Sequence, residues 1–237
     1  MRIIAIESAG PALGLAAVET GDDKRPVDQE ETMELDTALR HTESLVPALT
    51  SLMERVGWVP DSIGAVLVGS GPGSFTGLRV GMAAAKGIAL AANCPVVSVD
   101  TLEAYAETWR ASSPPREAES SPPLIVSVID ARKGRLYTAF FMEEPASDTT
   151  AALTRISGNM DLEPEALTTR IEAALERDTR LAGWVHAHAS PTAITGVVRL
   201  GLRALAAGEM DDAWKGPAYL RESDVGEPRR YPRFSSD

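Results

Sequence analysis

The stretch Gly69-Ser70-Gly71-Pro72-Gly73-Ser74-Phe75-Thr76-Gly77-Leu78-Arg79 lies between two runs of very different pattern. The apolar run 63–68 before it is typical of a buried strand, and the proline-free run 78–93 after it predicts a helix. The glycines therefore lie at a strand-to-helix turn, where free backbone N–H groups and the helix dipole favour an anion. The rest of the chain can be placed around this junction.

The glycines of this stretch match neither of the two common nucleotide-binding motifs. No Gly-Lys-Ser/Thr follows them, as a P-loop requires, and the order Gly71, Gly73, Gly77 is not the spacing of G-x-G-x-x-G. Two interpretations remain: a phosphate cradle, or a tight turn in which Ser74 or Thr76 caps the helix. The pattern by itself favours the capped turn.

Composition and charge limit the class of protein. At 237 residues and 44% apolar content, the chain has room for one large domain or two small ones with a packed core. It has no run of about 18 apolar residues that could span a membrane, and residues 1–7 are too short and too soon acidic for a signal peptide. The single cysteine, Cys94, excludes an internal disulfide and indicates a reduced, cytoplasmic setting. A net charge of −11 disfavours binding of a nucleic-acid backbone by this chain alone.

A weak internal repeat predicts two lobes. Residues 3–7 and 125–130 are both apolar strands that end in a carboxylate, and each is followed by a turn and a returning strand. A segment rich in Ser, Pro and Glu separates the two copies and is typical of a linker. The predicted organisation is an N-terminal lobe, a linker, a C-terminal lobe whose last helix can pack back on the first, and a disordered tail, at 1–111, 112–123, 124–221 and 222–237.

Two predicted helices of the first lobe have compositions that suggest close packing. Residues 38–56 carry leucines at helical spacing, and residues 75–93 consist largely of glycine and alanine. Each glycine inside a helix costs about 1 kcal/mol relative to alanine, so a close approach must offset that cost. The small residues serve either packing within the lobe or a flat surface for a partner chain, and the sequence leaves both open.

Few residues offer chemistry. Glu7 and Asp130, at the ends of equivalent strands, could hold a magnesium ion between the lobes or accept hydrogen bonds from their own turns, and the second is favoured. His186 and His188 alternate on a predicted strand, but no third metal ligand is near them in the sequence. No Ser-His-Asp set can be argued, and nothing supports Cys94 as a nucleophile. The chain therefore carries little for independent catalysis.

Four segments together resemble the TsaB (YeaZ) family of the glycoprotease-like superfamily, which is paralogous to the transferase TsaD. They are residues 1–7 with their hairpin, Arg40-His41-Thr42-Glu43-Ser44-Leu45-Val46-Pro47, the stretch 69–79 continuing to Lys86-Gly87, and Asp130-Ala131-Arg132-Lys133-Gly134-Arg135-Leu136-Tyr137. The ending Pro217-Ala218-Tyr219-Leu220-Arg221 fits as well, so the resemblance covers 1–221. It implies a two-lobed actin-like ATPase fold, α/β, with mixed ribonuclease-H-like sheets flanked by helices.

The resemblance also implies a role beside other proteins. The helices 38–56 and 75–93 would form a four-helix bundle with TsaD, and the ATPase TsaE would join this pair. TsaD would transfer a threonylcarbamoyl group to an adenosine beside the anticodon of tRNAs that read codons beginning with adenine. The chain would support TsaD without catalysis of its own, would reach tRNA only through the complex, would be cytoplasmic without membrane contact, and could form a homodimer when alone.

The site residues implied by the resemblance fall into two groups. Those expected to face the partner are His41, Leu45, Leu49, Leu52, Val56, Leu78, Gly81, Ala84, Ala85 and Ile88. Those that could contact a nucleotide or another anion are Glu7, Ser8, Gly71, Gly73, Ser74 and Asp130. No catalytic residue, metal ligand or required cofactor is implied, although weak binding of ATP or ADP with Mg²⁺ at the partner interface is an expectation.

Two departures from the wider superfamily matter. Thr101 and Tyr105 stand where TsaD would carry a His-x-x-x-His metal pair, and neither is a good metal ligand. Glu7-Ser8-Ala9 stands where the family usually has Asp-Thr-Ser, which puts independent nucleotide binding in doubt. The alternatives are a stand-alone ATPase of the same fold and a metallopeptidase-like protein, and the missing histidines argue against the peptidase.

Overall fold

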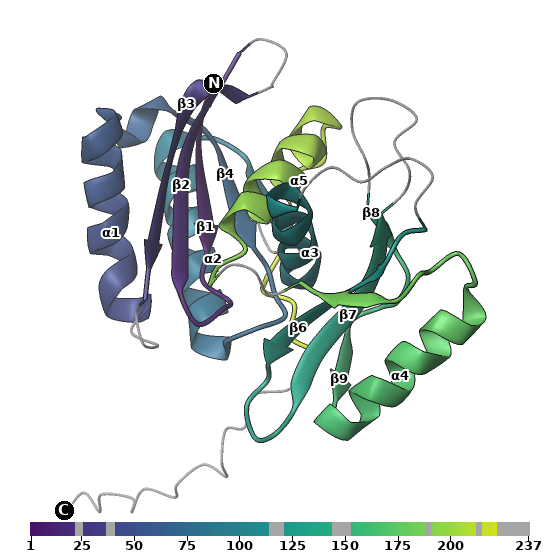
Figure 1. Cartoon of the computed structure of the whole chain (residues 1–237). Coiled ribbons are helices and arrows are strands. Elements are labelled where there is room, and N and C mark those ends of the chain that lie inside the picture. The colour runs from purple at the N-terminus through teal and green to yellow at the C-terminus, as the bar shows by residue number, and fades with distance from the viewer. Residues whose placement is uncertain are drawn as a thin grey trace, which may run out of the picture.

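The computed structural model describes residues 1–21, 26–36, 41–113, 121–143, 153–187, 191–211 and 215–221. Two mixed sheets with helices between and around them form two lobes, and the predicted two-lobed α/β fold is confirmed (Figure 1). No helix among the described residues has the length and apolar character needed to cross a membrane.

The first sheet has the strand order β3-β2-β1-β4-β5. Its strands are β1 (Arg2–Glu7), β2 (Leu13–Thr20), β3 (Pro26–Leu35), β4 (Ile63–Gly69) and β5 (Val96–Val99). The first three form an antiparallel meander, whereas β4 pairs parallel with both β1 and β5. Parallel neighbours need crossover connections, which are supplied by α1 (His41–Val56) with the short helix η1 (Pro60–Ser62), and by α2 (Phe75–Ala92).

The second sheet repeats the centre of the first. It has the order β10-β6-β7-β8, with β9 also paired to β7. Its strands are β6 (Leu124–Asp130), β7 (Leu136–Glu143), β8 (Leu153–Arg155), β9 (Met160–Leu162) and β10 (Trp184–His186). As β1 has antiparallel β2 on one side and parallel β4 on the other, β6 has antiparallel β7 and parallel β10.

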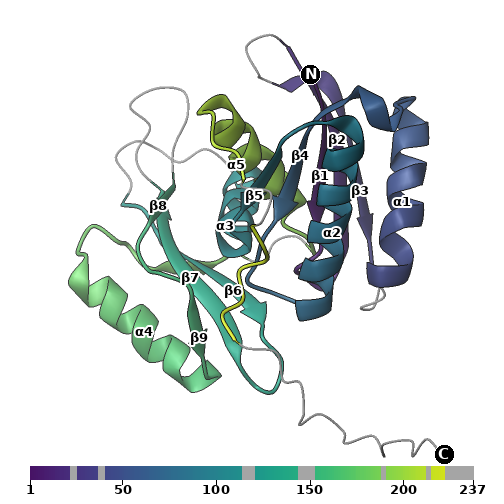
Figure 2. The ribbon, with the colours of Figure 1, turned by 180° about the vertical axis from the view of Figure 1, so that it is seen from behind.

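The helices complete five layers. Alternate residues of β1 point to opposite faces: Ile4 and Ile6 pack under α1 and α2, and Ile3 and Ala5 pack against the other core. That second core is shared by α3 (Thr101–Ser112), α5 (Ile194–Ala206) and the inner face of the second sheet, and α4 (Pro164–Arg177) covers the outer face (Figures 1 and 2). The helix α5, late in the chain, thus packs on the first sheet.

The predicted linker and tail lie mostly outside the described residues. Ser112 still belongs to α3 and β6 begins at Leu124, while 114–120 and the predicted disordered tail 222–237 are not described. The proposed lobe boundaries therefore stay predictions.

Candidate functional site

The glycine turn, residues 69–74, is held by hydrogen bonds within the chain. The N–H of Ser70 donates to the Val99 carbonyl at 2.8 Å, that of Gly71 to Thr101 Oγ1 at 3.0 Å, and that of Ser74 to the Ala9 carbonyl at 2.8 Å. Three N–H groups of the turn are therefore already bonded within the chain. The capped-turn interpretation is confirmed, because Ser74 is the N-cap of α2 and its Oγ accepts from the Gly77 N–H at 3.2 Å.

The small residues of α2 allow it to approach the end of β1. A Cβ atom at Gly77 would overlap the backbone carbonyl of Ser8, and one at Gly81 would overlap the Ser8 side chain. The Ser8 hydroxyl donates to the Gly77 carbonyl at 2.9 Å across this contact. Packing within the lobe therefore accounts for the glycines on this face.

This packing corrects most of the predicted partner surface. The side of α1 and α2 that carries the predicted partner positions faces the sheet. Six of these positions are buried in the chain's own core, namely Leu45, Leu49, Leu52, Leu78, Gly81 and Ala85. Three others are half-buried and pack against the same core, namely Val56, Ala84 and Ile88. The side chain of His41 lies outside the described residues.

The outward faces of the two helices carry residues that the predicted partner surface did not include. Val46 on α1 is 62% exposed and Leu90 on α2 is 85% exposed. Ala83, Gly87 and Ala91 are exposed on α2 as well. The sequence signal for these positions was their place on the helix, on the side opposite the buried apolar residues. An apolar side chain there is not buried by the sheet of its own chain, which indicates a different packing partner.

Glu7 is buried rather than offered to a ligand. Its side chain is fully buried, Oε1 accepts from the Ala9 N–H at 2.6 Å, and Oε2 is buried with no hydrogen-bond partner among the described residues. Burial raises the pKa of Glu7 to about 7, and hydrogen bonds from the backbone of Ala9 and Gly10 offset only part of that rise. The carboxyl group therefore holds its proton in acid and titrates near neutral pH.

The favoured interpretation of the two strand-ending acids, hydrogen bonding within their own turns, is confirmed. Asp130 is 68% exposed on the β6–β7 turn and its Oδ1 accepts from the Arg132 N–H at 2.7 Å. Each strand-ending acid thus bonds the N–H two residues onward in its own turn. The described residues contain no group of three His, Cys, Asp or Glu side chains that could hold a metal ion. His186 is in β10, and His188 lies outside the described residues.

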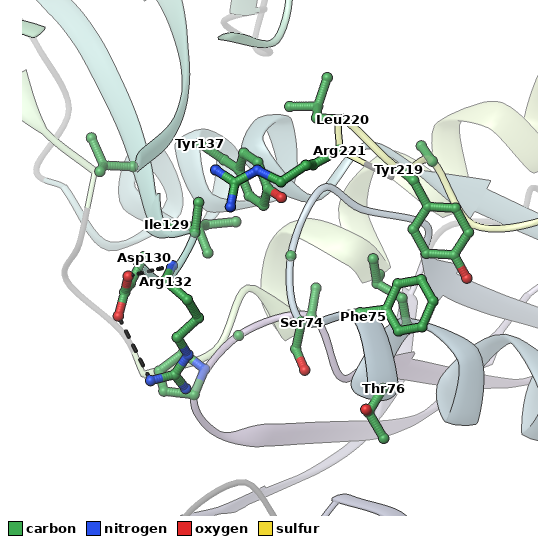
Figure 3. Close-up of a pocket in the computed structure, with 18 of the residues that line it drawn as sticks. Ser74, Phe75, Thr76, Ile129, Asp130, Arg132, Tyr137, Tyr219, Leu220 and Arg221 are labelled. Atoms are coloured by element: carbon green, nitrogen blue, oxygen red, sulfur yellow. Dashed lines mark hydrogen bonds and ion pairs between the residues drawn. The ribbon is translucent and has the colours of Figure 1, made fainter. Parts of the chain in front are cut away.

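A cleft of about 760 Å³ lies between the lobes (Figure 3). Three of the predicted anion contacts line it, namely Gly73, Ser74 and Asp130. The other three do not, which corrects their assignment: Glu7 and Ser8 are buried beneath the turn, and Gly71 is buried with its N–H bonded to Thr101. The cleft also contains cations that the sequence reasoning missed, namely Arg79, Arg132, Lys133 and Arg221.

A C-terminal segment, residues 215–221, forms one wall of the cleft and connects the lobes. The N–H of Ala218 donates to the Ser70 carbonyl at 2.7 Å, which attaches the segment to the glycine turn. At its end, Arg221 binds Asp161 of β9 at 2.9 Å. Burial alone would raise the pKa of Asp161, but hydrogen bonds from Arg135 and Arg221 lower it on balance.

Comparisons with known proteins agree with this architecture. The family model described as TsaD, tRNA N6-adenosine threonylcarbamoyltransferase, matches residues 35–172, more than half of the chain. The tRNA threonylcarbamoyladenosine biosynthesis protein TsaB of Escherichia coli is 32% identical over 61% of this chain and 56% of its own length. TsaB of Bacillus subtilis is 30% identical over 60% of this chain and 55% of its own length, so the matched part spans about half of each relative. YeaZ from Pseudomonas aeruginosa superimposes with a TM-score of 0.68 at 20% identity, covering 92% of this chain and 99% of that one.

The two mixed sheets and the fold shared with YeaZ define a two-lobed α/β protein. The family model and the curated relatives identify the family within that class. The chain belongs to the TsaB (YeaZ) family of the glycoprotease-like superfamily, related to the transferase TsaD.

Proposed function

We propose that this chain takes part in forming threonylcarbamoyladenosine in tRNA as a non-catalytic partner of TsaD, in a complex that TsaE joins. The family membership supports the pathway, and the outward faces of α1 and α2 support the partnership. These two helices lie side by side on one face of the first sheet and form an outer layer of the molecule (Figure 2). The observation that carries the proposal is Leu90, an 85% exposed leucine within this layer of small residues.

The partner that we propose for this surface is the equivalent helix pair of TsaD. A paralogue of the same fold presents two helices in the same arrangement, so the pairs can combine as a four-helix bundle. Small exposed side chains such as Ala83 and Gly87 allow close approach of the facing helices. A homodimer of this chain would use the same faces when TsaD is absent.

We propose that the chain is not catalytic because Thr101 and Tyr105 have structural roles. Thr101 Oγ1 accepts a hydrogen bond from the Gly71 N–H, and Tyr105 is buried with its hydroxyl 3.5 Å from the Pro191 carbonyl. Both positions, where TsaD would carry its metal pair, are thus used to hold the structure.

The partnership predicts that Leu90→Glu prevents pairing. A charge placed on the outward face of α2 should weaken binding to TsaD of the same genome by at least about tenfold, because an apolar contact is lost and a carboxylate is desolvated. Co-purification followed by size-exclusion chromatography measures the effect. Trp184→Glu, at a 52% exposed position on β10 of the other lobe, is the matched control and should pair normally. Equal pairing by both variants would reject this interface, and sizing of the chain alone reports the homodimer.

We propose further that no nucleotide is required, and that ATP or ADP with Mg²⁺ binds only weakly, at the partner interface. Three N–H groups of the glycine turn are already bonded within the chain, which leaves fewer donors for a phosphate. Isothermal titration of the isolated chain with ATP and Mg²⁺ should show no binding in the micromolar range. Micromolar binding together with hydrolysis would favour the stand-alone ATPase instead.

A further inference from the structure

The cleft between the lobes is basic although the chain is acidic. Arg79, Arg132, Lys133 and Arg221 line it, and Asp130 is the one carboxylate among the described lining residues. Arg221 is in an ion pair with Asp161 and Arg132 lies 3.8 Å from Asp130, so the four cations still outnumber the two carboxylates that pair with them. The whole chain has a net charge of −11. A concentration of cations in a cleft raises the local concentration of an anion there, even when the surrounding surface repels it.

One wall of the cleft is built from two rings in tilted contact and a guanidinium group. The rings of Phe75 and Tyr219 are 5.0 Å apart, and Arg79 lies 3.8 Å over Phe75 while its Nε donates to the Tyr219 hydroxyl at 2.9 Å. These contacts fix the Arg79 side chain in place. Tyr219 is 41% exposed, so part of its ring is open to a ligand.

The opposite wall carries cations on a tight turn. Arg132 and Lys133 follow β6 with backbone φ angles of 62° and 55°, and the Arg132 N–H is held by Asp130. The Arg132 side chain is 62% exposed. Figure 3 shows Arg132 and Asp130 across the open centre of the cleft from Phe75 and Tyr219. A ligand here would therefore meet positive charge on both sides and an aromatic surface on one.

We propose that this cleft binds a short single-stranded segment of RNA, with phosphates at Arg79 and Arg132 and a base against Tyr219. Proteins bind single-stranded nucleic acid with cations placed along its phosphate backbone and with exposed aromatic rings on which the bases stack. A volume of about 760 Å³ is that of a site for a small ligand, which suits one stretch of strand and not a duplex. The inference rests on the proposed function, since the RNA would be the tRNA that the complex modifies. It differs from the expectation that the chain reaches tRNA only through the complex, because here the chain itself contacts the RNA.

The test uses the full chain and a fluorescein-labelled single-stranded RNA of about ten nucleotides, followed by fluorescence anisotropy between about 0.05 M and 0.2 M salt. Wild-type protein should bind the RNA at low salt and lose it steeply as salt rises. Arg132→Ala should reduce the slope of log affinity against log salt by about 0.7, the value for one phosphate contact on a single strand. Tyr219→Ala should weaken binding about tenfold at every salt concentration, because stacking is not screened.

Arg170→Ala is the matched control, since it removes the same charge from an exposed position on α4 that does not line the cleft. Equal effects of Arg132→Ala and Arg170→Ala would overturn the proposal, as would absence of RNA binding at low salt. Binding of ATP or of poly-glutamate with the same Arg132 dependence, and no binding of RNA, would also overturn it and identify the other occupant. Pairing with TsaD is measured on the same variants, so a failure here with normal pairing leaves the proposed function standing.

Discussion

Replacing Gly77 with alanine should destabilise the protein by about 3 kcal/mol, whereas the same change at Gly87 of the same helix should stabilise it by about 1 kcal/mol. A Cβ atom at Gly77 would overlap the backbone carbonyl of Ser8, which cannot rotate away as a side chain could. The shift of α2 would also strain the hydrogen bond from the Ser8 hydroxyl to the Gly77 carbonyl. At Gly87 no atom lies within 4 Å of the new Cβ, so alanine only improves the helix propensity.

Urea unfolding of the two variants and the wild type, followed by circular dichroism, measures both changes. The slope with denaturant should be unchanged, so that the midpoints report stability directly. Similar small effects at both positions would show that α2 does not lie against the end of β1 as described. Gly87→Ala also tests the partner surface, because an added methyl group on the outward face should affect pairing with TsaD more than the stability of the free chain.

The contrast between Gly77 and Gly87 shows where sequence reasoning was sufficient and where it was not. The strand-to-helix turn, the Ser74 cap and the paired hairpins follow from local pattern, and the structure confirms them. A helix rich in small residues on every side gives no local signal for which face meets its own sheet. Both faces could accept a close neighbour, so the predicted partner positions fell largely on the buried face.

The cleft was missed for a different reason. Its aromatic wall joins Arg79 to Tyr219, and its far wall comes from the turn after β6. Such contacts depend on how the two lobes and the C-terminal segment meet, and no spacing in the sequence records that. The same holds for Glu7, where the sequence shows an acid at a strand end but not that the strand end is covered.

Glu7 should make the protein less stable as pH rises. The group's ordinary pKa of 4.5 is raised to about 7 in the folded chain, mainly by burial. Between these values the unfolded chain has released a proton that the folded chain still binds. The contribution of Glu7 to the free energy of unfolding is therefore complete below pH 4.5 and is lost as the pH rises to about 7. The total loss is about 3 kcal/mol, from about 1.4 kcal/mol for each unit of pKa difference.

Glu7→Gln should remove this dependence, because an amide is neutral at every pH and its oxygen can still accept from the Ala9 N–H. The variant should match the wild type near pH 4 and exceed its free energy of unfolding by about 3 kcal/mol at pH 8. Asp161→Asn is the control of opposite sign. The pKa of Asp161 is lowered by its hydrogen bonds to Arg135 and Arg221 despite the opposing effect of burial, so its contribution is present at neutral pH and lost in acid.

Urea unfolding at a series of pH values separates these cases. Loss of stability in Glu7→Gln at pH 8 would mean that the carboxylate is ionised and satisfied in solution, by water or by a cation at the orphaned Oε2 atom. That result would return Glu7 to the list of ligand contacts. The expected gain would instead show that the acid ending β1 is retained at a cost in stability, with its proton bound through most of the acidic range.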